Sequence, residues 1–323
     1  MLFIGCDGGS TKTEWVLADA RGEVLAHRKF SGCNIAYLGL QEFFSHMRKG
    51  LAELLGQAGA RPDEVAGAMF GLTTYGEVEG SDVAVPAFFQ RLLPAARIEV
   101  ANDAVAGWAG SLACRPGVHI VAGTGSVAYA RDEAGREARA GGWSILFADE
   151  GSASWVGREL FKAFVRQSDG RSPRTRLYDA VRRRLGFEND ILLAGFLEEK
   201  VRADSAILAR MQFTALELAR EGDPVAVAIY ASAARELTEL ARALRRRLRF
   251  AKKPVAVSYY GGLFEAGDVL LEPLSRAMAR AGFALQPPLY APVVGAAGLA
   301  AQGFLEEPQK AVFLGKIAQA LEP

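Results

Sequence analysis

Two short glycine turns carry side chains suited to binding phosphate. Glycine lets a backbone approach a ligand closely, and exposed N–H groups with Ser or Thr hydroxyls donate hydrogen bonds to phosphate oxygens. Each turn separates two apolar runs, which predicts that it joins two strands. One such turn is usually a plain hairpin, so the pair is the informative observation. The two turns are Gly8-Gly9-Ser10-Thr11-Lys12-Thr13 and Gly123-Thr124-Gly125-Ser126.

Other nucleotide-binding motifs fit this sequence poorly. Gly123-x-Gly125-x-x-Ala128 has the dinucleotide-binding spacing, but that pattern must open a helix, and residues 126–132 read as a strand and a turn. The chain contains no GxxxxGK[ST] run and no HRD or DFG signature. These absences exclude a P-loop enzyme and a protein kinase.

Two aspartates follow apolar strands, where ligands bind in open α/β sheets. Asp7 directly precedes the first glycine turn, where it could hold Mg²⁺ through waters or hydrogen-bond its own turn. Asp103 lies between a strand and a helix rich in small residues. Its carboxylate could serve as a general base or as the N-cap of that helix, and the two roles are compatible.

The segment 141–152 places an aromatic residue and two carboxylates between glycines, as Trp143 and Asp149-Glu150. Carboxylates that accept paired hydroxyl hydrogens and aromatic rings that cover C–H patches are the groups that recognise sugars. A helix cap followed by an acidic first turn would explain the carboxylates without a ligand. It would not explain a tryptophan in so glycine-rich a loop, so we favour a binding role.

The elements that position these residues occur twice in the same order, which predicts an internal duplication. Each copy reads strand, glycine turn, strand, turn, strand, helix, strand, helix, and the second copy contains a long helical insertion. In the first half the sequence predicts strands at 2–7, 13–18, 24–30, 65–72 and 97–101, and helices at 41–57, 81–93 and 103–114. In the second half it predicts strands at 118–122, 127–130 and 255–259, a helical stretch at 154–250, and helices at 268–281, 292–302 and 307–321.

Composition narrows the class of protein. With 323 residues, half of them hydrophobic, the chain is long enough for two lobes. Lys plus Arg (38) nearly balance Asp plus Glu (37), which argues against a nucleic-acid binder. The basic run 242–249 is interpreted as the solvated end of a helix. Neither a signal peptide nor an 18-residue apolar stretch is present, so we expect a cytoplasmic protein without membrane partners.

These residues resemble the N-acetylglucosamine kinase and BadF/BadG/BcrA/BcrD ATPase family, in the superfamily of actin, hexokinase and the heat-shock chaperones. The two glycine turns are similar to its phosphate motifs, and Gly142-Trp143 with Asp149-Glu150-Gly151-Ser152 are similar to its GGWG…GDEGS signature. The resemblance spans nearly the whole chain and implies duplicated ribonuclease-H-like α/β lobes with mixed five-stranded sheets and an interlobe cleft. Gly261-Gly262-Leu263-Phe264 resemble its adenosine motif, and Pro292-Val293-Val294-Gly295-Ala296-Ala297 its C-terminal segment.

The resemblance also implies an activity and roles for residues. It implies phosphorylation of an amino sugar, foremost the 6-OH of N-acetylglucosamine, with ATP and Mg²⁺ as cofactors, by a homodimer. Ser144 and Ala148 replace glycines of the family, which leaves glucosamine, N-acetylmannosamine and N-acetylmuramic acid as other acceptors. Asp103 falls where the kinases keep the base, and Asn34, Asp103, Thr124, Gly125, Trp143 and Asp149 fall where they contact the sugar.

We expect one lobe at 1–115, joined by a C-terminal helix at 305–323, and a second at 116–304 with the insertion at about 154–250. An ATPase that drives a partner protein is the main alternative activity. Its electron-donating form needs two cysteines per subunit for a shared iron–sulfur cluster, and no cysteine follows Cys114. A sugar-responsive regulator would add a DNA-binding domain, whereas here the first strand begins at residue 2.

Overall fold

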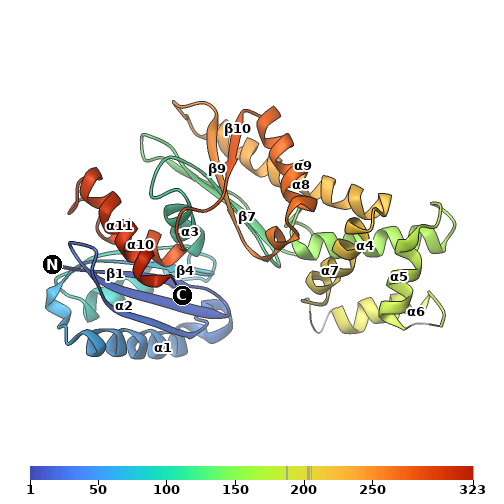
Figure 1. Cartoon of the computed structure of the whole chain (residues 1–323). Helices are drawn as coiled ribbons and strands as arrows, with labels where there is room; N and C mark the ends of the chain where they lie inside the picture. Colours follow the sequence, from blue (N-terminus) through green and yellow to red (C-terminus); the bar gives the residue numbers. More distant parts are fainter. Residues whose placement is uncertain (187, 202–203, 205, 323) are drawn as a thin grey trace. The chain divides into compact units, whose positions relative to one another are not determined.

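The computed structural model describes residues 1–186, 188–201, 204 and 206–322. The chain forms two compact units, one from residues 1–116 with 287–322 and one from residues 117–286. Each unit is built on a five-stranded mixed sheet, of order β3-β2-β1-β4-β5 in the first and β8-β7-β6-β9-β10 in the second (Figure 1). In both sheets an antiparallel three-strand meander is followed by two parallel strands. The predicted duplication is therefore confirmed.

The first unit follows the predicted order of elements closely. Helix α1 starts six residues before the predicted helix at 41–57, because the side chain of Asn34 caps it by accepting from the N–H groups of Ala36 and Tyr37. The strands are β1 (Leu2–Gly8), β2 (Lys12–Asp19), β3 (Val24–Ser31), β4 (Val65–Leu72) and β5 (Arg97–Ala101). The helices are α1 (Ile35–Ala58), α2 (Ser81–Leu92), α3 (Asp103–Ser111), α10 (Pro292–Ala300) and α11 (Glu307–Leu321).

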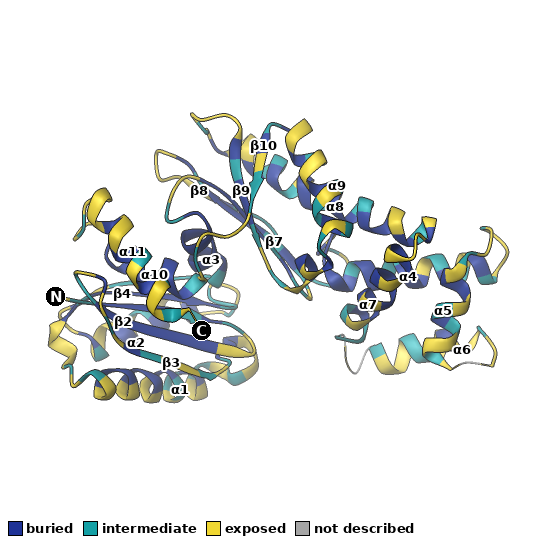
Figure 2. Ribbon diagram, in the orientation of Figure 1, coloured by how far each residue is buried: buried dark blue, intermediate teal, exposed yellow. Residues whose placement is uncertain are grey.

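Helices cover both faces of the first sheet. Helix α1 lies against β2 and β3, while α10 lies against β1 and β4 on the other side. The apolar stripe of α1, with Met47, Leu51 and Leu54, is buried, and its opposite face is exposed (Figure 2). The sequence analysis read this stripe correctly from its three- and four-residue spacing.

Residues 287–304 were expected in the second lobe, but they belong to the first unit. Helix α10 packs on β1 and on α3, with backbones in direct contact. A Cβ on Gly295 would lie 2.0 Å from the backbone nitrogen of Gly110, and one on Gly5 would lie 2.5 Å from the nitrogen of Ala297. Since α10 is buried on nearly every side, its sequence has no polar face to indicate which sheet it covers.

The second unit carries the predicted insertion between β8 and β9, resolved into separate helices. Positions 187, 202–203 and 205 of the predicted stretch, and position 323 of the predicted last helix, lie outside the described residues. Strand β10 occupies what the sequence analysis treated as a connection before Pro287. The strands are β6 (Gly117–Ala122), β7 (Ser126–Arg131), β8 (Glu137–Gly141), β9 (Val255–Tyr260) and β10 (Phe283–Gln286). The helices include α4 (Ala153–Ser168), α5 (Arg176–Leu185), α6 (Leu192–Phe196), α7 (Ala206–Arg220), α8 (Pro224–Arg247) and α9 (Asp268–Arg280).

The two units share even the hydrogen bonds of one turn. In the first unit Asp19 Oδ1 accepts from the N–H groups of Arg21 and Glu23. In the second unit Asp132 Oδ1 accepts from the residues two and four positions on, Ala134 and Arg136. Both turns connect the second and third strands of their meander, so the likeness is in both position and bonding.

Within the described residues, no helix is long and apolar enough to cross a membrane. Cys6 and Cys33 are buried and Cys114 is partly exposed, and none of them forms a disulfide with a described residue.

We predict that Gly295→Ala destabilises the protein. The new methyl group would meet backbone atoms of α3, which cannot rotate away, so the free energy of unfolding should fall by about 2 kcal/mol or more. Urea denaturation measures this change. Gly315→Ala on α11 is the matched control, because no atom lies within 4 Å of the added Cβ, and it should be neutral or slightly stabilising. Equal stability of the two variants would contradict the close packing of α3 and α10.

Candidate active site

Asp7 and Asp103 form a pair of interacting carboxylates in the first unit. Asp7 lies near the end of β1, and its neighbour on β4 is Gly71. A Cβ on Gly71 would lie 2.6 Å from the Cβ of Ala106 and 3.5 Å from the Cα of Asp103, so the bare backbone of β4 lets α3 approach. Burial, and next the negative charge of Asp103, raise the pKa of Asp7 to about 7. Two such carboxylates are suited to proton transfer and to sharing a cation.

The interpretation of Asp103 as the N-cap of its helix is wrong. Asn102 is the cap, since its side-chain oxygen accepts from the N–H of Ala104 at 3.2 Å. Asp103 is the first residue of α3 itself. The sequence reading missed the cap by one residue, and the carboxylate of Asp103 is therefore not required for capping.

The first glycine turn leads from β1 to β2, with Ser10, Thr11 and Lys12 exposed. The turn is closed by a bond from the N–H of Gly9 to the carbonyl of Lys12, at 2.9 Å. Thr13 differs from the other predicted phosphate ligands, because its side chain is fully buried and its hydroxyl donates to the carbonyl of Ser31. Lys12 forms an ion pair with Glu14 at 3.1 Å. The exposed hydroxyls and N–H groups of the turn are thus the groups available to a phosphate.

Asn34 connects this turn to the end of β4. Its side-chain amide donates to the hydroxyl of Ser10 at 2.9 Å, and its oxygen accepts from the hydroxyl of Thr74 at 3.2 Å. Thr74 has φ = 60°, a left-handed conformation that is rare for a β-branched residue. The sequence analysis missed Thr74. Its position just after β4, at the same edge as Asp7, is the signal that could have identified it.

The second glycine turn is fastened to the segment that follows β8. Ser126 donates from its hydroxyl to the carbonyl of Glu150 at 2.8 Å, and the N–H of Gly142 donates to the carbonyl of Ser126. The carbonyls of Gly123 and Thr124 accept from the N–H groups of Ala153 and Ser154 at the start of α4. The structure therefore brings the predicted turn Gly123–Ser126 and the predicted sugar loop together in one unit.

Asp149 is buried next to Gly125. A Cβ on Gly125 would lie 2.5 Å from Asp149 Oδ2, so a larger residue at that position would displace the carboxylate. The carboxylate accepts from the backbone of Trp143 and Ser144, yet burial raises its pKa above the usual range. Oδ1 is buried and accepts no hydrogen bond from any described residue. A buried acceptor of this kind fits a ligand that brings its own donor, such as a hydroxyl group.

Helix capping does not explain Asp149, because Ser152 caps α4 by accepting from the N–H of Trp155 at 3.1 Å. Asp149 instead adopts φ = 54°. Three large side chains of the loop are exposed: Trp143 is 80% exposed, Leu146 78% and Phe147 77%. Ile145 is partly buried. The loop thus exposes most of its large apolar side chains and buries one carboxylate.

Comparisons with known proteins identify the family of this chain. Residues 4–300 match the BadF/BadG/BcrA/BcrD ATPase family. The chain belongs to this family. An N-acetylmuramic acid/N-acetylglucosamine kinase of Clostridium acetobutylicum is 30% identical over 271 residues, which are 80% of this chain and 84% of that protein. An N-acetyl-D-glucosamine kinase of Dictyostelium discoideum is 26% identical over 289 residues, 85% of this chain and 89% of that protein.

A solved structure has a similar fold. It is a Chromobacterium violaceum protein provisionally assigned as an N-acetylglucosamine kinase, 26% identical to this chain. The TM-score is 0.68, and the match covers 93% of this chain and 98% of that protein. The two-lobed sugar-kinase fold expected from the sequence is therefore confirmed.

The segment similar to the adenosine motif of this ATPase family follows β9 as a short 3-10 helix, Gly262–Ala266. Leu263 and Phe264 are buried in the core of the second unit, and the ring of Phe264 lies 4.6 Å from that of Tyr259. The side chains of these two residues thus support the segment from inside. Gly262 is exposed, so a ligand at this place would meet backbone.

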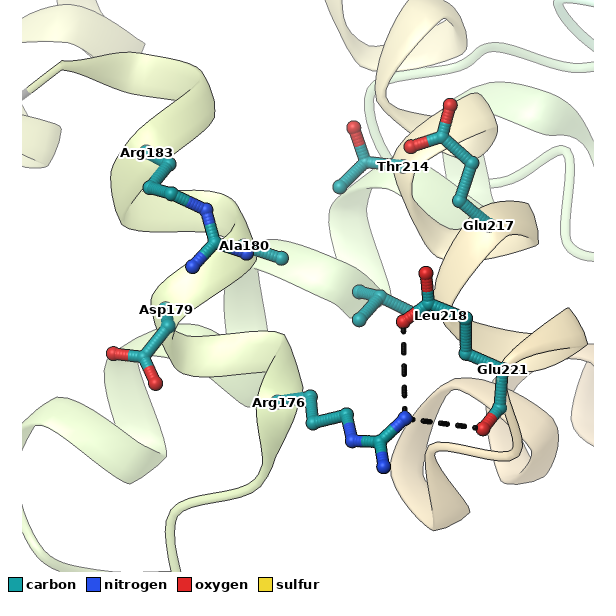
Figure 3. Close-up of a pocket in the computed structure, with 8 residues that line it drawn as sticks. All are labelled: Arg176, Asp179, Ala180, Arg183, Thr214, Glu217, Leu218 and Glu221. Carbon is teal, nitrogen blue, oxygen red and sulfur yellow. Dashed lines mark hydrogen bonds and ion pairs between the residues drawn. The ribbon is translucent and has the colours of Figure 1, made fainter.

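A separate hollow of about 190 Å³ lies in the insertion of this family member, between α5 and α7 (Figure 3). Arg176 of α5 forms an ion pair at 3.9 Å with Glu221, which directly follows α7, and the other charged side chains lie around the same opening. Its lining includes none of the residues predicted for ATP or sugar. The lining residues are Arg176, Asp179, Ala180, Arg183, Thr214, Glu217, Leu218 and Glu221.

We predict that Asp7→Asn stabilises the protein at neutral pH. The folded protein holds the proton of Asp7 up to a pKa of about 7, whereas an unfolded chain releases it near 3.8. Wild-type stability should therefore fall as pH rises from about 4 to 7, because the folded state binds more protons there. Asn has no proton to release, so the variant does not lose stability in this way. At pH 8 its free energy of unfolding should exceed that of the wild type by at most about 4 kcal/mol, at about 1.4 kcal/mol per pKa unit.

Urea denaturation between pH 4 and 8, with EDTA present, measures this difference. Asp19→Asn is the control of opposite sign: although burial opposes it, hydrogen bonds from the backbone of Glu23 and Arg21 and from the Arg21 side chain lower the pKa of Asp19. That variant should lose stability above pH 4. An advantage of Asp7→Asn that does not grow with pH would refute the raised pKa of Asp7.

Proposed function

We propose that this protein is an ATP-dependent amino-sugar kinase that converts N-acetylglucosamine to N-acetylglucosamine 6-phosphate. The single observation that carries the proposal is the carboxylate of Asp149: Oδ2 lies beside Gly125 of the second glycine turn, and the buried Oδ1 has no donor among the described residues. Membership in an ATPase family and two amino-sugar kinases among the relatives support the same activity.

In this proposal the sugar 6-hydroxyl attacks the γ-phosphorus of ATP. A new bond forms between the sugar oxygen and the γ-phosphorus, and the bond from the γ-phosphorus to the oxygen that bridges it to the β-phosphorus breaks. ADP leaves with that oxygen, and Asp103 accepts the proton of the hydroxyl. The turns Gly8–Thr13 and Gly123–Ser126 are assigned to the phosphates, the backbone around Gly262 to the adenosine, and Asn34, Thr124, Trp143 and Asp149 to the sugar. Positioning and electrostatic stabilisation supply most of the acceleration in reactions of this type.

Asp7 is the residue that would hold Mg²⁺, through water molecules. Mg²⁺ uses one or two carboxylates together with substrate phosphates rather than a protein cage. In keeping with this, no cluster of three or more His, Cys, Asp or Glu side chains suited to a metal occurs in the described part of the chain. The repulsion that raises the pKa of Asp7 is what a divalent cation would relieve. When bound, the ion would neutralise charge on the phosphates.

An ATPase that drives a partner protein is the second candidate, and it is favoured by the family match alone. The amino-sugar kinase is the better supported candidate, because Asp149 lies in the segment predicted to bind a sugar and its Oδ1 has no donor among the described residues. The homodimer implied by the resemblance is part of the proposal and is tested by sedimentation.

A panel of acceptors tests the proposal. ADP release is measured with N-acetylglucosamine, glucosamine, N-acetylmannosamine, N-acetylmuramic acid, glucose, or no sugar. We expect release to depend on an amino sugar and to be fastest with N-acetylglucosamine, with product identified by mass spectrometry. ADP release at the same rate with every sugar and with none would instead establish the partner-driven ATPase.

We predict that Asp103→Asn lowers kcat by at least ~10²-fold, the lower range for general-base catalysis, with a much smaller change in sugar KM. The carboxamide keeps the size of the side chain but cannot accept the proton. Asp82→Asn is the matched control, because Asp82 also lies in the first turn of a helix of the same unit and is exposed. Near wild-type turnover of Asp103→Asn would remove Asp103 from the mechanism.

A further inference from the structure

Arg158 on α4 reaches across to the loop that ends at Asp149, here called the acceptor loop (residues 142–149). Its Nη1 donates to the carbonyl oxygens of Ile145 and Leu146, the latter at 3.1 Å. Its Nη2 donates to the carbonyl oxygen of Ala148 at 3.1 Å. Arg158 is partly buried, and within the described residues it forms no ion pair with a carboxylate. One guanidinium group thus bonds to three carbonyl oxygens of the loop.

The acceptor loop has few other anchors. Three of its large apolar side chains, Trp143, Leu146 and Phe147, are exposed and so contribute little packing. At its start the N–H of Gly142 donates to the carbonyl of Ser126 on β7, and the Arg139 side chain donates to the carbonyl of Gly142. Two further bonds lie within the loop: the hydroxyl of Ser144 accepts from the N–H of Leu146, and the N–H of Ala148 donates to the carbonyl of Ser144. Ser144, which replaces a glycine of the family, therefore tightens the loop internally but does not attach it to α4. That attachment depends on Arg158.

The bond to Ala148 has a particular consequence for Asp149. The carbonyl of Ala148 belongs to the peptide that precedes Asp149, and Asp149 has φ = 54°. A non-glycine residue stays in this conformation only where its surroundings hold it. Arg158 fixes the peptide before Asp149, and the N–H of Ser152 bonds to the carbonyl of Asp149 after it. Together they keep the carboxylate against Gly125.

We propose that Arg158 is a positioning residue, which holds the acceptor loop so that Asp149 can bind the sugar. The proposal rests on the amino-sugar kinase activity proposed above. Arginine suits the role because its planar guanidinium presents donors along two edges at once, whereas the ammonium of lysine is a single point charge. Lysine at this position cannot reach both Ile145 and Ala148.

The kinetic test compares Arg158→Gln and Arg158→Lys with the wild type. We expect both variants to raise the sugar KM by ~10-fold or more, as expected for a misplaced binding group, and to leave the ATP KM within about twofold. Guanidinium ion at millimolar concentration should partly restore Arg158→Gln. Arg166→Gln is the matched control, since Arg166 lies on the same helix and is exposed, and among the described residues its side chain donates only to the hydroxyl of Ser172. It should leave both KM values unchanged.

A second measurement does not depend on activity. Chymotrypsin cuts after exposed aromatic and leucine side chains, so cleavage at Trp143, Leu146 or Phe147 reports how firmly the loop is held. We expect both Arg158 variants to be cut several-fold faster than the wild type and Arg166→Gln, with the rest of the chain intact. If the wild type phosphorylates no amino sugar, the proposed function fails, but the cleavage rates still test whether Arg158 holds the acceptor loop. Cleavage and sugar KM that are unchanged in Arg158→Lys would overturn the proposal.

Discussion

The first unit depends on backbones that meet without side chains between them. Helix α10 contacts both β1 and α3 through glycine, and α3 contacts β4 at Gly71. These contacts bring the start of α3 to the edge of the sheet where β1 ends. The electrostatic effect of Asp103 on Asp7 is a result of this packing. A core of larger side chains would separate the two carboxylates. The interaction of Asp7 with Asp103 therefore requires small residues where α3, α10 and the sheet meet.

In the second unit the candidate ligand group lies on a loop, so hydrogen bonds rather than close backbone packing must hold it in place. Asp149 has an unusual backbone conformation and a buried carboxylate, both of which are unfavourable in isolation. Hydrogen bonds from Arg158, Ser126 and Ser152 surround the loop and the residues that follow it. The bonded positions are backbone carbonyls and amides, which leaves the exposed side chains free to vary.

The sequence predicted most of the strands and helices that occur in both units. Hairpin turns, amphipathic helices and the two glycine turns have local patterns, and these were read correctly. Helix α10 was assigned to the wrong unit because its residues are nearly all apolar or small. Without a polar face, the sequence does not indicate which sheet the helix covers. Strand β10 has four residues next to a proline-rich connection, too few for a period to be visible. The site residues stay predictions, and their mutual placement within each unit could not be read from spacing.

The errors at the site were errors of one position or of burial. Asn102, not Asp103, caps α3, and the cap of α4 is Ser152, in agreement with the choice of a non-capping role for Asp149. Both carboxylates lie one to three residues from a better cap, which propensity alone cannot resolve. Leu263 and Phe264 belong to a motif, yet their side chains pack into the core. Thr74 lacks any motif and is identified only by its place at the end of β4.

The first unit is discontinuous in the chain, which bears on how it is made. Its strands are complete by residue 101, but α10 begins at Pro292, after the whole of the second unit. On a ribosome adding about 5–20 residues per second, the early strands wait roughly 10–40 s for the helix that covers them. During that time the groove over Gly5 and Gly67 is open to water or to a chaperone. The second unit is continuous in the chain and can fold before synthesis ends. The first unit is therefore the first to be synthesised and the last to complete its fold.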